Sequence, residues 1–403
     1  MGLTKNDFNE SKNTKEEFGV STLLIHSDDI LNGRTVNDVA PPINVSTTFR
    51  YSKNSDDWIP WRDQTQEQQN KLLNEDFVYS RLSHPNNIRL ETNLNKVFKG
   101  YTTVYNSGLS TFNAIMTYVN PSQVFFEDCY HGIKSISRIW ERNNSVKVYT
   151  KLDDIFDNLQ EGDLVHLESP INPYGTVIDV AKYIDFAHSK KAFVVWDATF
   201  APPPVLDPWK FDVDFVIHSL TKYFGGHSDL LAGALITRDS SINTVLKNDR
   251  IYLGTNIGNL EAYLLLRSLR TYEMRYKQQS ANVADLVRWI SENNDNYKRI
   301  GLKITHALLQ KDTFVKDQLE GELTTPVFSL YLKDFETCKK FISNLNFFQH
   351  ATSLGGVESL VELRCLTDPH IDLNLIRISV GCEDSKDLIN DIKKSLENCL
   401  ETI

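Results

Sequence analysis

A lysine flanked by hydroxyl groups and followed by glycines is the most chemically informative feature of this sequence. Ser219, Thr221 and Lys222 follow the apolar run DVDFVI, and Gly225 and Gly226 come shortly afterwards. The hydroxyl groups could bind a phosphate, and the lysine amine could form a Schiff base with an aldehyde of the same molecule. A surface lysine in a polar loop is the commoner explanation of so short a motif. The segment therefore predicts a site for a phosphorylated aldehyde only together with other segments.

Asp197 is a second candidate, because it directly follows the apolar run Ala192–Trp196. A carboxylate at the carboxyl end of a buried strand is costly unless it is paired, and a protonated pyridine nitrogen would be a suitable partner. With that partner the ring would act as an electron sink. The alternative is an aspartate that caps a helix or a turn.

A strand-to-helix transition and an aromatic residue add two further parts of such a site. Ser107, Gly108 and Leu109 stand where a short strand pattern becomes a helical one. Backbone N–H groups at a helix start bind anions, and glycine allows a phosphate to approach closely. Tyr130 follows another strand and could stack on a flat ring, although packing is the commoner role of such a residue.

Arginines provide candidate partners for anions. Arg377 lies within the otherwise apolar run IRISV, where a guanidinium needs an anionic partner such as a substrate carboxylate. A structural ion pair is the alternative. Arg81, preceded by Tyr79, is a second basic group, for which a solvated loop is the alternative. Together these segments supply a lysine, a ring-nitrogen partner, a phosphate cup, a stacking ring and a carboxylate clamp.

The elements that must position these residues follow an α/β pattern with a mostly parallel sheet. Apolar runs predict seven strands of the large domain: 103–105, 123–127, 145–149, 164–168, 192–196, 215–218 and 233–237. Several of these strands end in polar residues at one edge of the sheet, where such folds bind ligands. Residues 259–293 are predicted to be one long helix. Beyond them, strands at 325–332 and 375–380 alternate with helices, as expected of a smaller α/β domain.

Composition excludes several classes of protein. The 403 residues carry 43 Lys and Arg against 53 Asp and Glu, a net charge of −10, which argues against a nucleic-acid partner. The five cysteines are scattered without a CxxC pair, so we expect neither a disulfide framework nor a metal site. We expect the protein to reside in a reducing compartment. No long apolar run or secretory signal is present, so we expect a cytoplasmic protein without a membrane partner.

The chain divides into three predicted parts. These are an N-terminal arm over 1–60, a cofactor-binding domain over 61–255 and a C-terminal domain with its linking helix over 256–403. The segment from Ser52 to Asp76 is rich in Gln, Asn and Asp, with Trp58 and Trp61 embedded, and is predicted to be a surface excursion. An arm of this kind often wraps a neighbouring subunit.

Eight ordered blocks give the sequence a specific resemblance to a known family. They are YSRLSHPN, NSGLS, ESPINP, DATFAPP, HSLTKYFGGHSDLLAGA, LLLRSLRT, SLGGVESL and RISVGCED. The chain resembles the Cys/Met-metabolism family of pyridoxal 5'-phosphate (PLP) enzymes, which includes the cystathionine lyases and synthases, from about Gly19 to about Asp384. The resemblance implies the aspartate-aminotransferase-like fold, fold type I, with a large mixed-sheet cofactor domain and a smaller C-terminal α/β domain.

The resemblance also implies a role for each candidate residue. Lys222 would be the Schiff-base lysine, Tyr130 the stacking and possible proton-transfer residue, and Asp197 the partner of the pyridinium nitrogen. The phosphate would be bound by Ser107, Gly108, Leu109, Ser219 and Thr221. Tyr79 and Arg81 would reach the phosphate of an adjacent subunit, implying a homodimer or homotetramer with shared active sites. The substrate carboxylate would be bound near Asn172, Ser353 and Arg377.

The implied activity is a PLP-dependent carbon–sulfur lyase of transsulfuration that acts on a sulfur amino acid, cystathionine or a related cysteine thioether. A γ-replacement enzyme, such as a cystathionine γ-synthase or an acylhomoserine sulfhydrylase, is the main alternative, and a non-catalytic paralogue is a further one. Two departures leave the substrate open. Thr352 precedes SLGG where many members have an acidic or aromatic residue, and Leu363–His370 lacks the usual Pro and Met-Thr-His pattern.

Overall fold

A computed structural model describes residues 18–29, 31, 39–74 and 76–401. Its larger sheet has seven strands in the order β1-β7-β6-β5-β4-β2-β3, and β7 runs antiparallel to both of its neighbours while the other pairs are parallel. The strands are β1 (Tyr101–Tyr105), β2 (Gln123–Phe125), β3 (Lys147–Tyr149), β4 (Leu164–Glu168), β5 (Phe193–Asp197), β6 (Phe215–Ser219) and β7 (Gly233–Thr237). The predicted mixed-sheet domain is confirmed.

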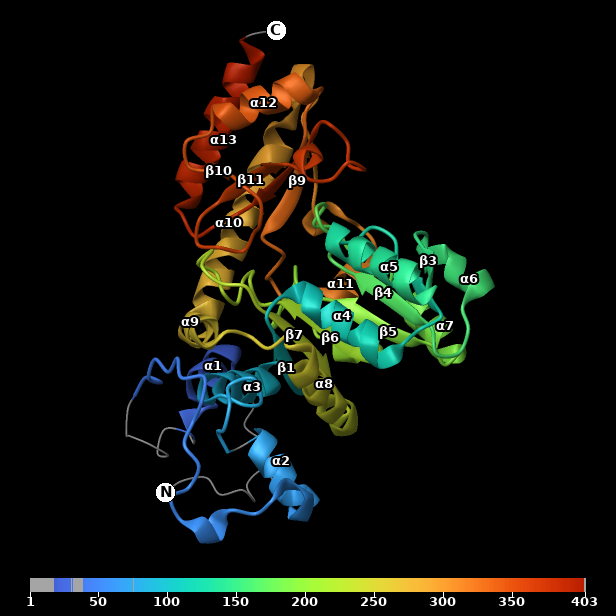
Figure 1. Cartoon of the computed structure of the whole chain (residues 1–403). Coiled ribbons are helices and arrows are strands. Elements are labelled where there is room, and N and C mark those ends of the chain that lie inside the picture. Colours follow the sequence, from blue (N-terminus) through green and yellow to red (C-terminus); the bar gives the residue numbers. More distant parts are fainter. Residues whose placement is uncertain (1–17, 30, 32–38, 75, 402–403) are drawn as a thin grey trace.

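Helices cover both faces of this sheet, which explains why its central strands are mostly apolar (Figure 1). In β5, Val194 and Trp196 join the core on one face, and Val195 joins the core on the other. Successive side chains of a strand point to opposite faces, so a strand buried on both sides needs apolar residues at consecutive positions. The flanking helices are α3 (Pro85–Val97), α4 (Gly108–Val119), α5 (His131–Asn144), α6 (Ile155–Asn158), α7 (Ala181–Ser189) and α8 (Ser240–Leu253).

The second sheet has five strands in the order β10-β11-β12-β9-β8. These are β8 (Lys303–Thr305), β9 (Val327–Tyr331), β10 (Gln349–His350), β11 (Leu360–Leu363) and β12 (Leu375–Ser379). Helices α10 (Tyr272–Asn293), α12 (Phe335–Ser343) and α13 (Ser385–Leu400) share a core with one of its faces. The sequence predicted β9 and β12 but not β8, β10 or β11, which are short and contain charged or polar residues.

Alternation along β12 places one functional residue on the face away from these helices. Ile376 and Ile378 belong to the helix-side core, whereas Arg377 lies between them and faces the other way. In the antiparallel ladder Arg377 is paired with Glu362 of β11 and with Ser329 of β9. The sheet thus presents a polar row toward the cofactor domain.

The prediction of one long helix over 259–293 is wrong, because two helices occupy this range. Helix α9 (Asn259–Leu269) ends before Thr271, and α10 begins at Tyr272. The side chain of Arg275 donates to the carbonyl of Ser268, 3.0 Å away, which also accepts from the backbone N–H of Thr271 at 3.2 Å in the turn between the helices. Arg275 therefore stabilises the bend.

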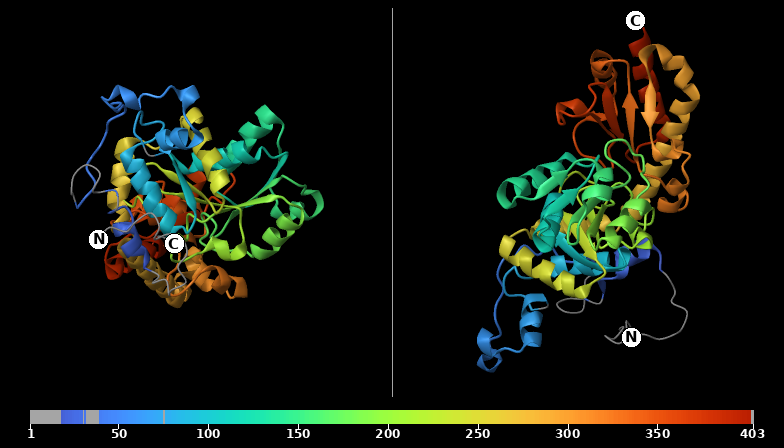
Figure 2. Two further views of the ribbon diagram at one scale, coloured as in Figure 1. Left: turned by 90° about the horizontal axis from the view of Figure 1, so that it is seen from below. Right: turned by 90° about the vertical axis from the view of Figure 1, so that its right-hand side faces the viewer.

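The N-terminal segment contributes one packed helix and a projecting excursion (Figure 2). Helix α1 (Val20–His26) lies against α3 and α10. The excursion carries two short 3-10 turns, Ser55–Asp57 and Trp61–Asp63, and helix α2 (Gln66–Asn74). Its tryptophans are exposed, which confirms the predicted surface position. The predicted arm covers residues 1–60, and its first 17 residues lie outside the described part of the chain.

Two further findings concern the described ranges as a whole. None of their helices is both long and apolar enough to cross a membrane. All five cysteines fall within these ranges, and no disulfide bond joins any two of them. The remaining short helix of the C-terminal part is α11 (Thr313–Gln318).

Phe328 of β9 is fully buried in the core of the second sheet, so its truncation should destabilise the protein. We expect Phe328→Ala to lower the free energy of unfolding by about 3–5 kcal/mol in urea denaturation followed by circular dichroism. Phe347→Ala, the same truncation at an exposed position, serves as the control. It should change stability by less than about 0.5 kcal/mol. Equal effects of the two variants would contradict the assignment of this core.

Candidate active site

A cavity of about 530 Å³ lies where the carboxyl ends of β4, β5 and β6 meet the polar face of the second sheet. Ligands of open α/β folds bind at this edge because the strand ends and the following loops converge there. The cavity brings together most of the predicted site residues: Ser107, Gly108, Leu109, Tyr130, Asn172, Asp197, Ser219, Thr221, Lys222, Ser353 and Arg377.

Lys222 lies on the loop after β6, and its amine points at the second sheet. Its Nζ donates to Oγ of Ser353 at 2.9 Å. Burial and, to a smaller extent, the nearby Arg377 charge lower the pKa of Lys222 to about 8, against an opposing effect of Glu362. A lysine with this pKa is partly unprotonated near neutral pH, which is the form that attacks an aldehyde.

Two contacts from outside the loop hold the lysine segment in place. Arg275 of α10 donates to the carbonyl of Tyr223 at 2.8 Å. Gly355 has a φ of +84°, and a Cβ there would lie 2.8 Å from the backbone nitrogen of Tyr223. Only a glycine allows the loop after β10 to pack so closely against the lysine segment. Neighbouring Ser353 has a φ of +79°, a costly conformation for a residue with a side chain.

Asp197 and Glu168 end adjacent parallel strands and face each other across the ladder. Oδ1 of Asp197 accepts from the backbone N–H of Thr199 at 3.0 Å. Burial raises the pKa of Asp197, while burial and then the charge of Asp197 raise the pKa of Glu168. Two buried carboxylates repel each other when both are ionised, so a cation placed beside Asp197 would be strongly stabilised.

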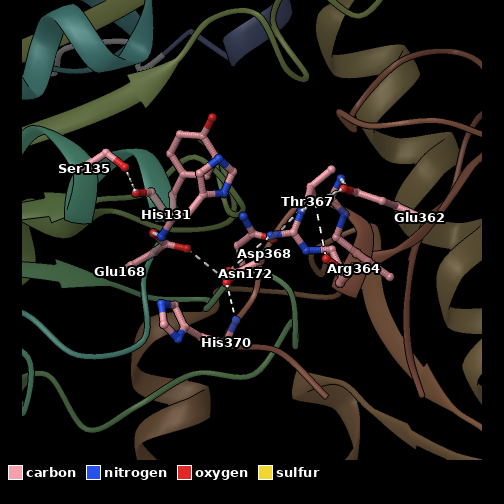
Figure 3. Close-up of polar contacts among 11 residues, drawn as sticks. His131, Ser135, Glu168, Asn172, Glu362, Arg364, Thr367, Asp368 and His370 are labelled. Atoms are coloured by element: carbon pink, nitrogen blue, oxygen red, sulfur yellow. Dashed lines mark hydrogen bonds and ion pairs between the residues drawn. The ribbon is translucent and has the colours of Figure 1, made fainter. Parts of the chain in front are cut away.

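Glu168 also ties two site loops together, a role that the sequence analysis did not assign to it. Its oxygens accept from the backbone N–H of Tyr130 at 2.7 Å and from that of Asn172 at 2.9 Å (Figure 3). The signal was present, since Glu168 ends a predicted strand at the ligand edge. Its pairing with Asp197 depends on strand order, which the sequence alone does not show.

The predicted phosphate cup forms at the start of α4. Ser107 caps the helix by accepting from the N–H of Ser110 at 3.1 Å. A Cβ on Gly108 would lie 3.2 Å from Cβ of Ser219, so the glycine keeps the cup open beside the hydroxyl of the lysine segment. Thr221 lines the same region. These hydroxyl groups and helical N–H groups are suitable donors for a phosphate.

Arg377 is buried at the wall of the cavity. It donates to Oδ1 of Asn172 at 3.1 Å and to the carbonyl of Ser353 at 2.7 Å, and it forms an ion pair with Glu362. Burial lowers the pKa of Arg377 to about 10, so it stays cationic at neutral pH. The arrangement offers a fixed guanidinium to a carboxylate, as predicted for substrate binding.

Tyr130, at the start of α5, lines the cavity, and its ring lies 4.5 Å from that of His131. Tyr79 and Arg81 do not line the cavity of the same chain. Arg81 donates to the carbonyl of Ile251 at 3.0 Å and lies over the Tyr79 ring. Their predicted contact with the phosphate of an adjacent subunit remains a prediction.

A charged cluster that the sequence analysis missed lies at the second sheet. Arg364 donates to Oε1 of Glu362 at 2.9 Å, and the hydroxyl of Thr367 donates to the same oxygen at 2.7 Å (Figure 3). All three line the cavity. Arg364 and Thr367 belong to Leu363–His370, where the chain departs from the family pattern. That departure was the available signal, but β11, which brings Glu362 to the site, was not predicted.

The described residues fit PLP. The cavity holds an amine for the aldehyde, a carboxylate for the ring nitrogen, an aromatic ring beside the site and a cup of donors for the phosphate. With the two sheets and their order, this set of groups defines a PLP-dependent enzyme of fold type I.

Comparison with known proteins gives the family. The chain belongs to the Cys/Met metabolism PLP-dependent enzyme family, whose pattern it matches over residues 21–397. It is 28% identical to cystathionine gamma-lyase of Dictyostelium discoideum, over 95% of this chain and 98% of that protein. It is 29% identical to cystathionine gamma-synthase of Escherichia coli, over 88% and 92%. The structure of a methionine gamma lyase from Micromonospora echinospora superposes with a TM-score of 0.79 at 30% identity, covering 94% and 99%.

The pKa of Lys222 should govern how fast the apoprotein takes up PLP. We expect the uptake rate, followed by absorbance, to rise with pH through a midpoint near 8. Glu362→Gln removes a charge that raises this pKa and should shift the midpoint to lower pH. Arg377→Met removes a charge that lowers it and should shift the midpoint to higher pH. The exposed Arg238, outside the cavity, provides the control Arg238→Gln. Shifts in the same direction for both site variants would disprove the electrostatic account.

Proposed function

We propose that the protein is a PLP-dependent carbon–sulfur lyase that cleaves cystathionine or a related cysteine thioether. The observation that carries this proposal is the convergence of Lys222, Asp197 and Arg377 on one cavity. They provide the groups that a PLP enzyme needs to act on an α-amino acid: an amine, a ring-nitrogen partner and a carboxylate clamp. The lyases among its relatives support the same activity.

The residues have separate tasks in this proposal. Bound PLP supplies an electron sink for negative charge at the substrate Cα. Asp197 keeps the ring nitrogen protonated. Arg377, held by Asn172 and by the carbonyl of Ser353, binds the substrate α-carboxylate and thereby orients the Cα–H bond. Lys222 would hold the cofactor through Nζ, and the same Nζ would accept the Cα proton of the substrate.

The loop residues complete the site. Ser353 accepts from Lys222 Nζ and so holds the amine beside the cavity. Tyr130 lies at the start of α5 with its backbone held by Glu168, and its hydroxyl assists proton transfer or the departing sulfur group. Because Glu168 also holds the backbone of Asn172, the stacking ring and the carboxylate clamp keep a constant relative position.

A γ-replacement reaction is the second candidate, because it would use the same lysine and ring. The similarity to cystathionine gamma-synthase supports it. We favour a non-catalytic paralogue least. The cavity contains a lysine, an aspartate, a tyrosine and hydroxyl groups at the positions proposed to contact the cofactor within one chain.

A product assay tests the reaction type. The holoenzyme incubated with cystathionine should release homocysteine and pyruvate by β-cleavage, or cysteine and 2-oxobutyrate by γ-cleavage. Lys222→Ala should lose at least about 10³-fold of this activity and should fail to retain cofactor after borohydride reduction. Formation of cystathionine from an activated homoserine and cysteine, without either keto acid, would instead identify the γ-replacement enzyme.

The proposed shared site predicts complementation between two inactive variants. Arg81→Ala and Lys222→Ala should each be inactive alone, because one lacks the phosphate contact and the other the lysine. In mixed dimers one of the two sites receives both intact residues, so the isolated mixed dimers should recover about half of the wild-type activity. Co-expression with two affinity tags isolates the mixed species. No recovery in these mixed dimers would show that Arg81 does not act across subunits.

A further inference from the structure

The cavity contains a guanidinium for which the proposed mechanism has no task. Among its described lining residues, Lys222, Arg364 and Arg377 are basic. The mechanism uses Lys222 for the cofactor and Arg377 for the substrate α-carboxylate. Arg364 remains, with a side chain that is only 5% exposed. A buried guanidinium is costly unless acceptors surround it, so its unused donors indicate what it can bind.

Three of the five N–H donors of Arg364 lack a hydrogen bond. Nη1 donates to Glu362 at 2.9 Å and to Thr367 at 3.2 Å. Nε is buried and makes no hydrogen bond within the described part of the chain. Nη2 has only a long ion pair, 3.8 Å from Oδ2 of Asp368, and no hydrogen bond to a described residue. The group can therefore accept another anion without giving up its short contacts.

The position of Arg364 suits the far end of a bound amino acid. Arg364 contacts Oε1 of Glu362, and Arg377 pairs with Oε2 of the same carboxylate. One flexible substrate can thus reach both guanidinium groups. His131 lines the same cavity, and burial together with the Arg364 charge lowers its pKa, so it is neutral and adds no competing positive charge. In Figure 3, Arg364 and Glu362 lie across the site from His131 and Glu168.

We propose that Arg364 binds a second, distal carboxylate of the substrate and so selects thioether amino acids that are acidic at both ends. This inference rests on the proposed function for the orientation of the substrate. It assigns a specificity role to the segment Leu363–His370, whose sequence departs from the family pattern. Arg364 would form charge-assisted hydrogen bonds with the distal carboxylate through Nη2, in competition with the distant Asp368.

A matched pair of ligands tests the proposal by binding rather than by turnover. S-(2-carboxyethyl)-L-cysteine and S-propyl-L-cysteine differ only in a carboxylate or a methyl group at the far end. In stopped-flow measurements on the holoenzyme, the change in cofactor absorbance is recorded before the first turnover, and we expect the first ligand to bind about 10- to 100-fold more tightly. Arg364→Gln should bring this ratio close to one while leaving the affinity for S-propyl-L-cysteine within about twofold, and Arg364→Lys should retain part of the preference.

Two controls separate distal recognition from a positioning role. Thr367→Val removes a hydroxyl that donates to Glu362 and accepts from Arg364, but it removes no charge, so the preference for the acidic ligand should persist. Arg142→Gln removes an exposed arginine outside the cavity and should have no effect. Equal binding of the two ligands by the wild type, or an equal loss for both in Arg364→Gln, would overturn the proposal. Since the binding phase precedes turnover, a clear preference without cleavage of any thioether would refute the proposed function and leave this inference standing.

Discussion

The buried Arg377 depends on a complete set of oxygen acceptors, and much of the site depends on Arg377. Its contacts come from three chain segments: Asn172 after β4, Ser353 before β11 and Glu362 within β11. A guanidinium that is removed from water needs each of these partners, so their positions are coupled. The same charge lowers the pKa of Lys222. The arginine therefore joins the two sheets and tunes the lysine amine.

A carboxylate pair plays the corresponding part on the cofactor side. Asp197 and Glu168 are neighbours because β4 and β5 are adjacent and parallel. A cationic ring nitrogen beside Asp197, as proposed, would relieve their mutual repulsion in this buried place. Glu168 at the same time accepts from two loop N–H groups. The same carboxylate pair thus links the protonation of Glu168 and Asp197 to the position of the two loops.

The resemblance between this chain and enzymes with different reactions follows from the same arrangement. In the proposed mechanism lysine, aspartate and arginine act at Cα of any amino acid, which leaves the distal part of the substrate to other groups. In this chain Thr352, Thr367 and Arg364 also line the cavity. The segment that contains the last two forms a 3-10 turn at Arg364–Leu366 directly after β11. The proposed specificity residue Arg364 accordingly lies in a segment that departs from the family pattern.

The sequence by itself determined the α/β class, the larger sheet and the residues that line the cofactor end, because continuous apolar runs and glycine-bounded motifs are local patterns. It did not show the break between α9 and α10, which Arg275 stabilises by a side-chain contact, nor the short polar strand β11. Only the tertiary structure placed Glu168 beside Asp197 and Glu362 between Arg364 and Arg377. Those pairings depend on strand order and register, and the free energy of a buried charge depends on neighbours that are distant in the chain.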